Sequence, residues 1–190
     1  VLEQVPVPLQ VLDLDAGFAA ADAYATAEHA GLGGWWLEAG THPDKCTVCW
    51  FSFQITWDDL PAWFRHGQSV QLQSCIAALE ALAQLLLLLA RAESMNLRGN
   101  KIVFRFHQLC DNLGAASASR KQLTMSEPLS FVLQAAGFWC CKLGVALCPH
   151  HVAGERNVWA DELSRNQLEG FCPALRWQTD VCAVLQTPWS

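Results

Sequence analysis

Basic residues are scarce in this chain of 190 residues: Lys and Arg number 12 against 18 Asp and Glu, giving a formal net charge of −6. Proteins that hold nucleic acid through its phosphates normally carry clustered Lys and Arg, so the charge balance alone does not indicate such a partner. A hydrophobic share of 52% with 16% charged residues excludes a disordered chain. A chain of this length buries enough surface to fold as one domain without disulfide or metal support.

Signals for secretion or membrane insertion are also missing. The opening VLEQVPVPLQVLDLD has neither the basic start nor the apolar core of a signal peptide, and its first residue, Val1, suggests a fragment of a larger protein. The most apolar stretch, Cys75 to Ala90, is interrupted by Glu80 and Gln84 and is shorter than a membrane span requires. We therefore expect an intracellular protein, in the cytoplasm or nucleus, without membrane contact.

The chain has nine cysteines, an odd number that is typical of reduced thiols when no secretory signal is present. Cys46 and Cys49 form a CxxC pair, and Cys148 lies shortly before His150 and His151. A zinc site could be assembled from these residues, but a second CxxC or an HxxxH partner is missing. We expect thiols that behave as small apolar side chains, with the zinc site as the alternative.

Hydrophobic patterning predicts strands at residues 18–24, 31–40, 47–56, 101–106 and 145–148. Helices are expected from 69 or 71 to 92, directly after 111–112, over 127–142 and over 157–165. Three antiparallel strands followed by two parallel additions give an α/β fold with a five-stranded mixed sheet flanked by helices. Residues 1–16 are interpreted as a connector from a preceding domain, 17–168 as the domain and 169–190 as a C-terminal tail.

Four acidic residues fall at informative places. Asp22 lies within the first strand, Asp111 follows the fourth strand, and Asp161 lies in the last helix. Glu80 lies on the apolar stretch of the longest helix, where a carboxylate is costly to bury unless it is paired or bound to metal. Carboxylates gathered at one point repel one another, and hard divalent cations remove that penalty. Two such cations about 4 Å apart support hydrolysis of a phosphodiester, which is the predicted reaction class.

Four segments of the chain carry a family resemblance: ADAYATAEHAGLGGWW (21–36), IAALEALA (76–83), CDNLGAA (110–116) and HVAGERNVWADELSR (151–165). Through them, and over about residues 18–166, the sequence resembles the ribonuclease H domain of reverse transcriptases from long retroelements, especially DIRS-type and related elements. The last segment, with its N-x-x-A-D-x-L-S pattern, is the most specific, and the first is the least specific.

The resemblance implies a ribonuclease H-like fold and a two-metal endonuclease that cuts the RNA strand of RNA–DNA hybrids during reverse transcription. It implies two Mg²⁺ ions, with Mn²⁺ as a substitute, and a neighbouring reverse transcriptase domain in the same polyprotein. His151, with Gly154 after it, would assist water activation or product departure. The implied metal ligands are Asp22, Glu80, Asp111 and Asp161, and the implied substrate contacts are Asn112, Asn157 and Arg156.

Other interpretations remain beside this one. The segment VQLQS could stand in the register of the Glu motif and place Ser74 at the catalytic position, but only the Glu80 register supplies both Ile76 and Ala83. Asp111 and Asn112 alone would indicate an Asx turn or a helix cap. The scarcity of basic residues favours a catalytically inactive domain of the same fold that braces a polymerase or binds a partner. A related 3′–5′ exonuclease or resolvase would keep the metals and change the substrate.

Overall fold

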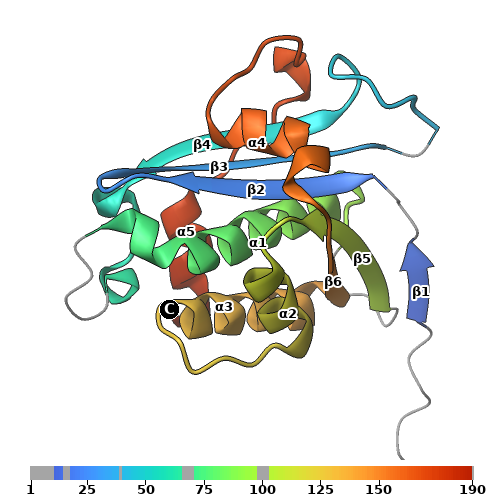
Figure 1. The fold of residues 1–190 in the computed structure, drawn as a ribbon. Coiled ribbons are helices and arrows are strands. Elements are labelled where there is room, and N and C mark those ends of the chain that lie inside the picture. The colour runs from blue at the N-terminus through green and yellow to red at the C-terminus, as the bar shows by residue number, and fades with distance from the viewer. Residues whose placement is uncertain (1–10, 15–17, 39, 66–70, 98–102, 190) are drawn as a thin grey trace, which may run out of the picture.

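The computed structural model describes residues 11–14, 18–38, 40–65, 71–97 and 103–189 (Figure 1). Within these ranges one mixed sheet is packed between helices on both faces. Most of the predicted connector, the earliest proposed helix start at 69 and the first two residues of the strand predicted at 101–106 lie outside the described residues.

The five strands expected from the sequence all form. β2 (Ala19–Ala25), β3 (His29–Trp36) and β4 (Cys49–Thr56) make an antiparallel meander. β5 (Val103–Cys110) then runs parallel to β2, and β6 (Val145–His151) runs parallel to β5. The predicted fold class, a mixed sheet of three antiparallel strands with two parallel additions, is confirmed.

A sixth strand, β1 (Val11–Leu14), lies within the segment predicted as a connector, so that part of the interpretation was wrong. β1 pairs in parallel with the first half of β5, whereas β2 meets β5 only where Ala20 pairs with Leu109. The two strands therefore follow one another along the same edge of β5. A strand of four residues is too short for its alternation to stand out in the sequence.

The helices occupy both faces of the sheet (Figure 1). α1 (Ile76–Ser94), α2 (Leu113–Lys121) and α3 (Leu129–Leu143) lie on one face, and α4 (Val158–Ser164) lies on the other, against β2 and β3. Short 3-10 turns occupy Trp57–Asp59, Ala62–Phe64, Leu72–Cys75, Gly154–Arg156, Pro173–Leu175 and Thr187–Trp189.

α1 is the centre of the core, and from Ala78 to Ala92 nearly every side chain is buried. With its 3-10 start, the helical segment Leu72–Ser94 spans 23 residues and is long and apolar enough to cross a membrane, so the sequence argument from length was wrong. Inside the protein, 72% of its most apolar window is buried. A helix packed between a sheet and α3 passes the same test of length and composition.

The C-terminal residues, interpreted from the sequence as a tail without a clear period, form short helical elements that pack against the domain. α5 (Val181–Gln186) places Val181, Val184 and Leu185 in the main core. Upstream of α5, Arg176 forms a bridge with Trp50 at the edge of β4. The short elements of this segment, each of six residues or fewer, leave no period long enough to detect in the sequence.

Candidate metal centre

Three of the four predicted carboxylates meet at one point. Asp22 comes from the middle of β2, Glu80 from α1, and Asp111 from the residue directly after β5. One oxygen from each lies within 4.8 Å of the oxygens offered by the other two. Because β2 and β5 share one residue pair and then separate, the end of β5 leaves room for side chains from both strands and from the helix beneath them. The topology therefore creates an acidic cluster at the carboxyl end of β5.

Burial dominates the electrostatics of this cluster. Asp22 and Glu80 are 5% and 4% exposed, whereas Asp111 is half-buried. Loss of solvation, followed by the charge of Asp111, raises the pKa of Asp22 to about 7. Loss of solvation, followed by the charge of Asp22, raises the pKa of Glu80 to about 9. Without a cation, this cluster therefore holds protons at neutral pH.

The donor set fits a hard divalent cation. Glu80 Oε2 is buried and accepts no hydrogen bond, which leaves a carboxylate oxygen without a partner inside the protein. Three carboxylates within bridging distance are the ligands that Mg²⁺ and Mn²⁺ prefer. Among the described residues, no other group of three His, Cys, Asp or Glu side chains brings its ligand atoms so close together.

Gln84 supports the cluster from below, one helical turn after Glu80. Its side-chain amide is fully buried and donates to the backbone oxygen of Ala21 at 3.2 Å and to that of Leu109 at 2.9 Å. These carbonyls belong to β2 and β5 near the point where the strands separate, so Gln84 ties the two strands together at the site. In the sequence, Gln84 is visible only as a polar interruption of an apolar run, four positions after Glu80.

Glycines in β3 let α4 approach the sheet with its backbone. A Cβ added to Gly31 or Gly33 would overlap the backbone of Ser164. Gly33 is also the residue paired with Asp22 across β2 and β3. Only residues without side chains permit this contact, which explains the glycine-rich run in the strand. The close approach brings the end of α4 over Asp22.

Ser164 is a residue of the site that sequence analysis did not assign. Its Oγ lies 2.8 Å from Asp22 Oδ2 and 2.8 Å from the backbone oxygen of Asp161. A hydroxyl has one proton, so it donates to one of these acceptors at a time. Donation to the carboxylate opposes the rise in the pKa of Asp22. The available signal was the position of Ser164 at the end of the most specific motif.

Asp161, the fourth predicted ligand, stands beside the cluster and not within it. Its Oδ1 accepts a hydrogen bond of 2.8 Å from Arg165 Nε, one turn further along α4, and its side chain is 45% exposed. The charge of Asp161 still reaches Asp22 and contributes to the raised pKa of that carboxyl. Arg165 in turn lies over the ring of Tyr24 at 4.4 Å. The structure therefore brings together three of the four predicted acids and pairs the fourth with an arginine.

His151 ends β6 next to the cluster. It pairs in register with Cys110, the residue before Asp111, and its side chain is exposed. The following loop also returns to the site, since a Cβ added to Gly154 would lie 3.2 Å from Asp111 Oδ2. The loop that the sequence associates with His151 therefore lies beside the third carboxylate.

The three predicted substrate contacts differ in their surroundings. Asn112 caps α2, with Oδ1 accepting from the backbone N–H of Ala115 at 2.9 Å. Arg156 is exposed in the loop before α4. Asn157 is only 2% exposed and donates to the backbone oxygen of Ala21 at 3.4 Å. Its predicted contact with substrate does not fit this burial, because its amide joins the start of α4 to β2.

No protein-family model matches this chain, and no curated protein matches it either. Ribonuclease H1 from the halophilic archaeon Halobacterium salinarum superposes with a TM-score of 0.50 at 12% identity, covering 84% of this chain and 98% of that one. The fold is ribonuclease H-like. The N-terminal ribonuclease H domain of a Mycobacterium tuberculosis protein, solved as a fusion with maltose-binding protein, matches with a TM-score of 0.46 at 14% identity, covering 80% of this chain and 93% of that one.

Proposed function

We propose that this chain is a divalent-metal-dependent nuclease of the ribonuclease H type that cuts the RNA strand of RNA–DNA hybrids. The observation that carries the proposal is the cluster of Asp22, Glu80 and Asp111, whose oxygens lie within 4.8 Å of one another on this fold. The buried Glu80 oxygen without a hydrogen-bond partner supports a cation as the missing partner. The structural neighbour from Halobacterium salinarum is a ribonuclease H by name, which supports the substrate class.

Asp22, Glu80 and Asp111 would hold Mg²⁺, or Mn²⁺ in its place, and Asp161, which here accepts a hydrogen bond from Arg165, would supply the fourth carboxylate of a two-ion site. The bound cations supply the Lewis acidity that phosphodiester hydrolysis needs. The chain contributes four further tasks. Ser164 orients Asp22, Gln84 holds β2 against β5, and burial excludes water from behind the carboxylates. The exposed His151 would assist water activation or product departure as a proton donor or acceptor.

We further propose a biological context for this activity. The sequence resemblance favours a retroelement polyprotein, in which a neighbouring reverse transcriptase domain would present the hybrid to this domain. A partner domain would also compensate for the scarcity of Lys and Arg, which number 12 in the chain. We place the protein inside the cell, where reverse transcription proceeds. Discrimination of RNA from DNA would come from contacts with 2′-hydroxyls across the wide minor groove.

The test compares cleavage of a labelled RNA–DNA hybrid in Mg²⁺ by the wild-type chain and by Asp111→Asn and Glu80→Gln. We expect near-total loss of cleavage in both variants, because each removes a charged oxygen ligand from the cluster. Asp58→Asn, which changes an exposed carboxyl in a 3-10 turn after β4, is the matched control and should cleave like the wild type. Hybrid cleavage that persists unchanged in both cluster variants would overturn the mechanism.

A second candidate function is a non-catalytic domain of the same fold that braces a polymerase or binds a partner. The hydrogen bond between Asp161 and Arg165 favours it, because it occupies one oxygen of the fourth acid. Calorimetric titration with Mg²⁺ separates the two: a nuclease gives a binding signal that Glu80→Gln removes, and the inactive domain gives none. Comparing cleavage of hybrid, single-stranded DNA and branched DNA distinguishes a related exonuclease or resolvase.

A further inference from the structure

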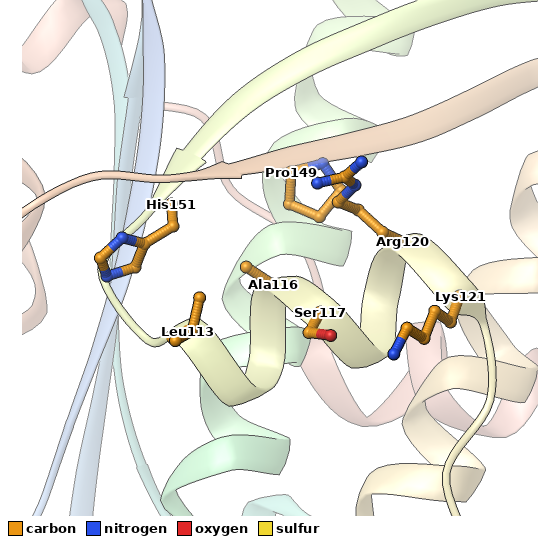
Figure 2. A pocket seen from close by; sticks show the side chains of 7 residues that line it. All are labelled: Leu113, Ala116, Ser117, Arg120, Lys121, Pro149 and His151. Atoms are coloured by element: carbon orange, nitrogen blue, oxygen red, sulfur yellow. The ribbon is translucent and has the colours of Figure 1, made fainter.

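A surface groove runs along α2, starting beside the carboxylate cluster. Figure 2 shows its side chains in a row, from His151 at one end to Arg120 and Lys121 at the other. The groove encloses about 360 Å³. Its remaining lining residues are Leu113, Ala116, Ser117 and Pro149. The helical positions 113, 116, 117 and 120 repeat at intervals that place them on one face of α2, so this face and β6 form the walls.

The groove adjoins the carboxylate cluster both in the sequence and in space. Leu113 follows Asp111 by two residues, and His151 pairs in register with Cys110, the residue before Asp111. A strand with one phosphodiester at the carboxylates would therefore pass directly into the groove. The site and the groove share their boundary at the start of α2.

Charge sets this groove apart from the rest of the protein. Its seven lining residues include two cations and no acid, in a chain whose net charge is −6. Arg120 and Lys121 are both exposed at the last turn of α2. A local excess of positive charge against an acidic background attracts a polyanion to this place and not to the surface in general.

The wall between the cations and the site is apolar. Leu113 is 65% exposed although it is a large hydrophobic residue, and the largely buried Ala116 and Pro149 line the groove behind it. An apolar wall does not help to bind a free inorganic anion, whereas it suits the sugars and bases between phosphates. The single hydroxyl of Ser117 adds one donor and acceptor in the middle.

The length of α2 indicates which phosphate of a bound strand Arg120 and Lys121 would contact. Leu113 and Arg120 lie about 10 Å apart along the helix axis, at about 1.5 Å per residue. One strand of a duplex advances about 3.4 Å along its axis for each phosphate. With the further step from Asp111 to Leu113, a strand that follows α2 spans about two to four phosphates between the carboxylates and these cations.

We propose that this groove binds the sugar-phosphate backbone of the strand being cut, with Arg120 and Lys121 contacting a phosphate about two to four nucleotides from the scissile linkage. This inference rests on the proposed nuclease function and adds the path of the substrate to it. The groove would also supply part of the affinity for nucleic acid that the low Lys and Arg content of the chain does not provide.

The first test measures binding of a fluorescent RNA–DNA hybrid by anisotropy, in chelator so that no strand is cut, over a range of salt. We expect Arg120→Gln to bind about tenfold more weakly, because a charged hydrogen bond to phosphate is lost. The slope of log affinity against log salt should fall by about 1 for each cation removed. Arg65→Gln removes an exposed cation that lies over Trp57, away from the groove, and is the matched control. Equal affinities and slopes in the two variants would overturn the proposal.

The second test locates the contact with a double-mutant cycle. Hybrids carry one neutral methylphosphonate linkage at successive positions of the cleaved strand, and kcat/KM is measured in Mg²⁺ for the wild type and for Arg120→Gln. At the contacted position the two changes should not add, because each removes the same interaction. We expect that position about two to four linkages from the cut. Effects that add at every position would contradict the proposed path.

These tests keep the two proposals separate. If the wild type cleaves hybrid and Arg120→Gln binds hybrid with the same affinity and salt dependence as Arg65→Gln, the proposed nuclease activity is retained and the proposed role of the groove is rejected. A wild type that neither cleaves nor responds to Mg²⁺ removes the nuclease, and the anisotropy measurement then decides alone whether the groove binds nucleic acid.

Discussion

α1 and α4 both bring functional side chains to Asp22, and they are held in place in different ways. α1 has 19 residues and is buried on nearly all sides, so its position is set by many side-chain contacts with the sheet and α3. α4 has seven residues and lies on β2 and β3 through its backbone, over the glycines of β3. The first arrangement distributes its stability over many contacts, and the second depends on a few positions without side chains.

Filling the space between the glycines of β3 and the backbone of α4 should have the largest effect on the free energy of unfolding. In Gly33→Ala the new Cβ overlaps backbone atoms of Leu163 and Ser164, which cannot move as a flexible side chain would. We expect a loss of more than about 3 kcal/mol in the free energy of unfolding, measured by chemical denaturation. Gly137→Ala, in the interior of α3 with only ordinary contacts, is the control and should gain about 0.5–1 kcal/mol. Similar stabilities for the two variants would refute the close approach.

Removing the hydrogen bonds that Gln84 of α1 donates to the sheet should have an intermediate effect on the free energy of unfolding. Gln84→Leu keeps the helix apolar and removes the two hydrogen bonds to Ala21 and Leu109. We expect a loss of about 1–3 kcal/mol, because the Leu109 carbonyl loses a donor and the Ala21 carbonyl keeps only the longer side-chain bond from Asn157. Gln134→Leu on α3 changes an exposed amide and should leave stability nearly unchanged. If Gln84→Leu proves as stable as the wild type, the amide does not tie β2 to β5.

The pH should also change the stability of the metal-free protein. Burial raises the pKa of Asp22 from 3.8 to about 7 and that of Glu80 from 4.5 to about 9, so the folded state binds protons more tightly than the unfolded state. The stability that this provides is complete below the unfolded pKa values and is lost as the pH rises through 7 and 9. Melting in chelator should therefore occur at lower temperature at pH 9 than at pH 5. Glu80→Gln should flatten the upper part of this dependence, and a profile that rises with pH would contradict it.

Regular elements and residues within them were predictable from the sequence. Asp22, Glu80 and Asp111 stand in or directly after long strands and a long helix, and these elements are clear apolar stretches in the sequence. The meander and the two later strands followed from the same stretches, and the choice of these acids as ligands followed from the resemblance. Burial of a carboxylate in an apolar helix was itself the signal for Glu80.

Features that depend on contacts between distant segments were not predictable. Ser164 meets Asp22 across 142 positions of the chain, which no local pattern predicts. The i,i+4 spacing of Asp161 and Arg165 is visible in the sequence, but the spacing alone does not show that Asp161 pairs with Arg165 and stands outside the cluster. The groove requires α2 and β6 to face each other, although α3 lies between them in the sequence. β1 and α5 were missed because four and six residues are too few for a periodic signal.

The segment after residue 168 has a practical consequence for any shortened version of this protein. Trp177 donates from its backbone to Trp50 at 2.8 Å and from its indole to Glu93 at 2.8 Å, and Trp139 donates to the backbone oxygen of Val184 at 3.0 Å. A chain that ends at about residue 166, where the similarity to ribonuclease H domains ends, would leave β4, the outer strand of the meander, uncovered. It would also expose one side of α1 to water. Such a product would aggregate before its chemistry could be measured, so enzymology on this domain should keep the final two dozen residues.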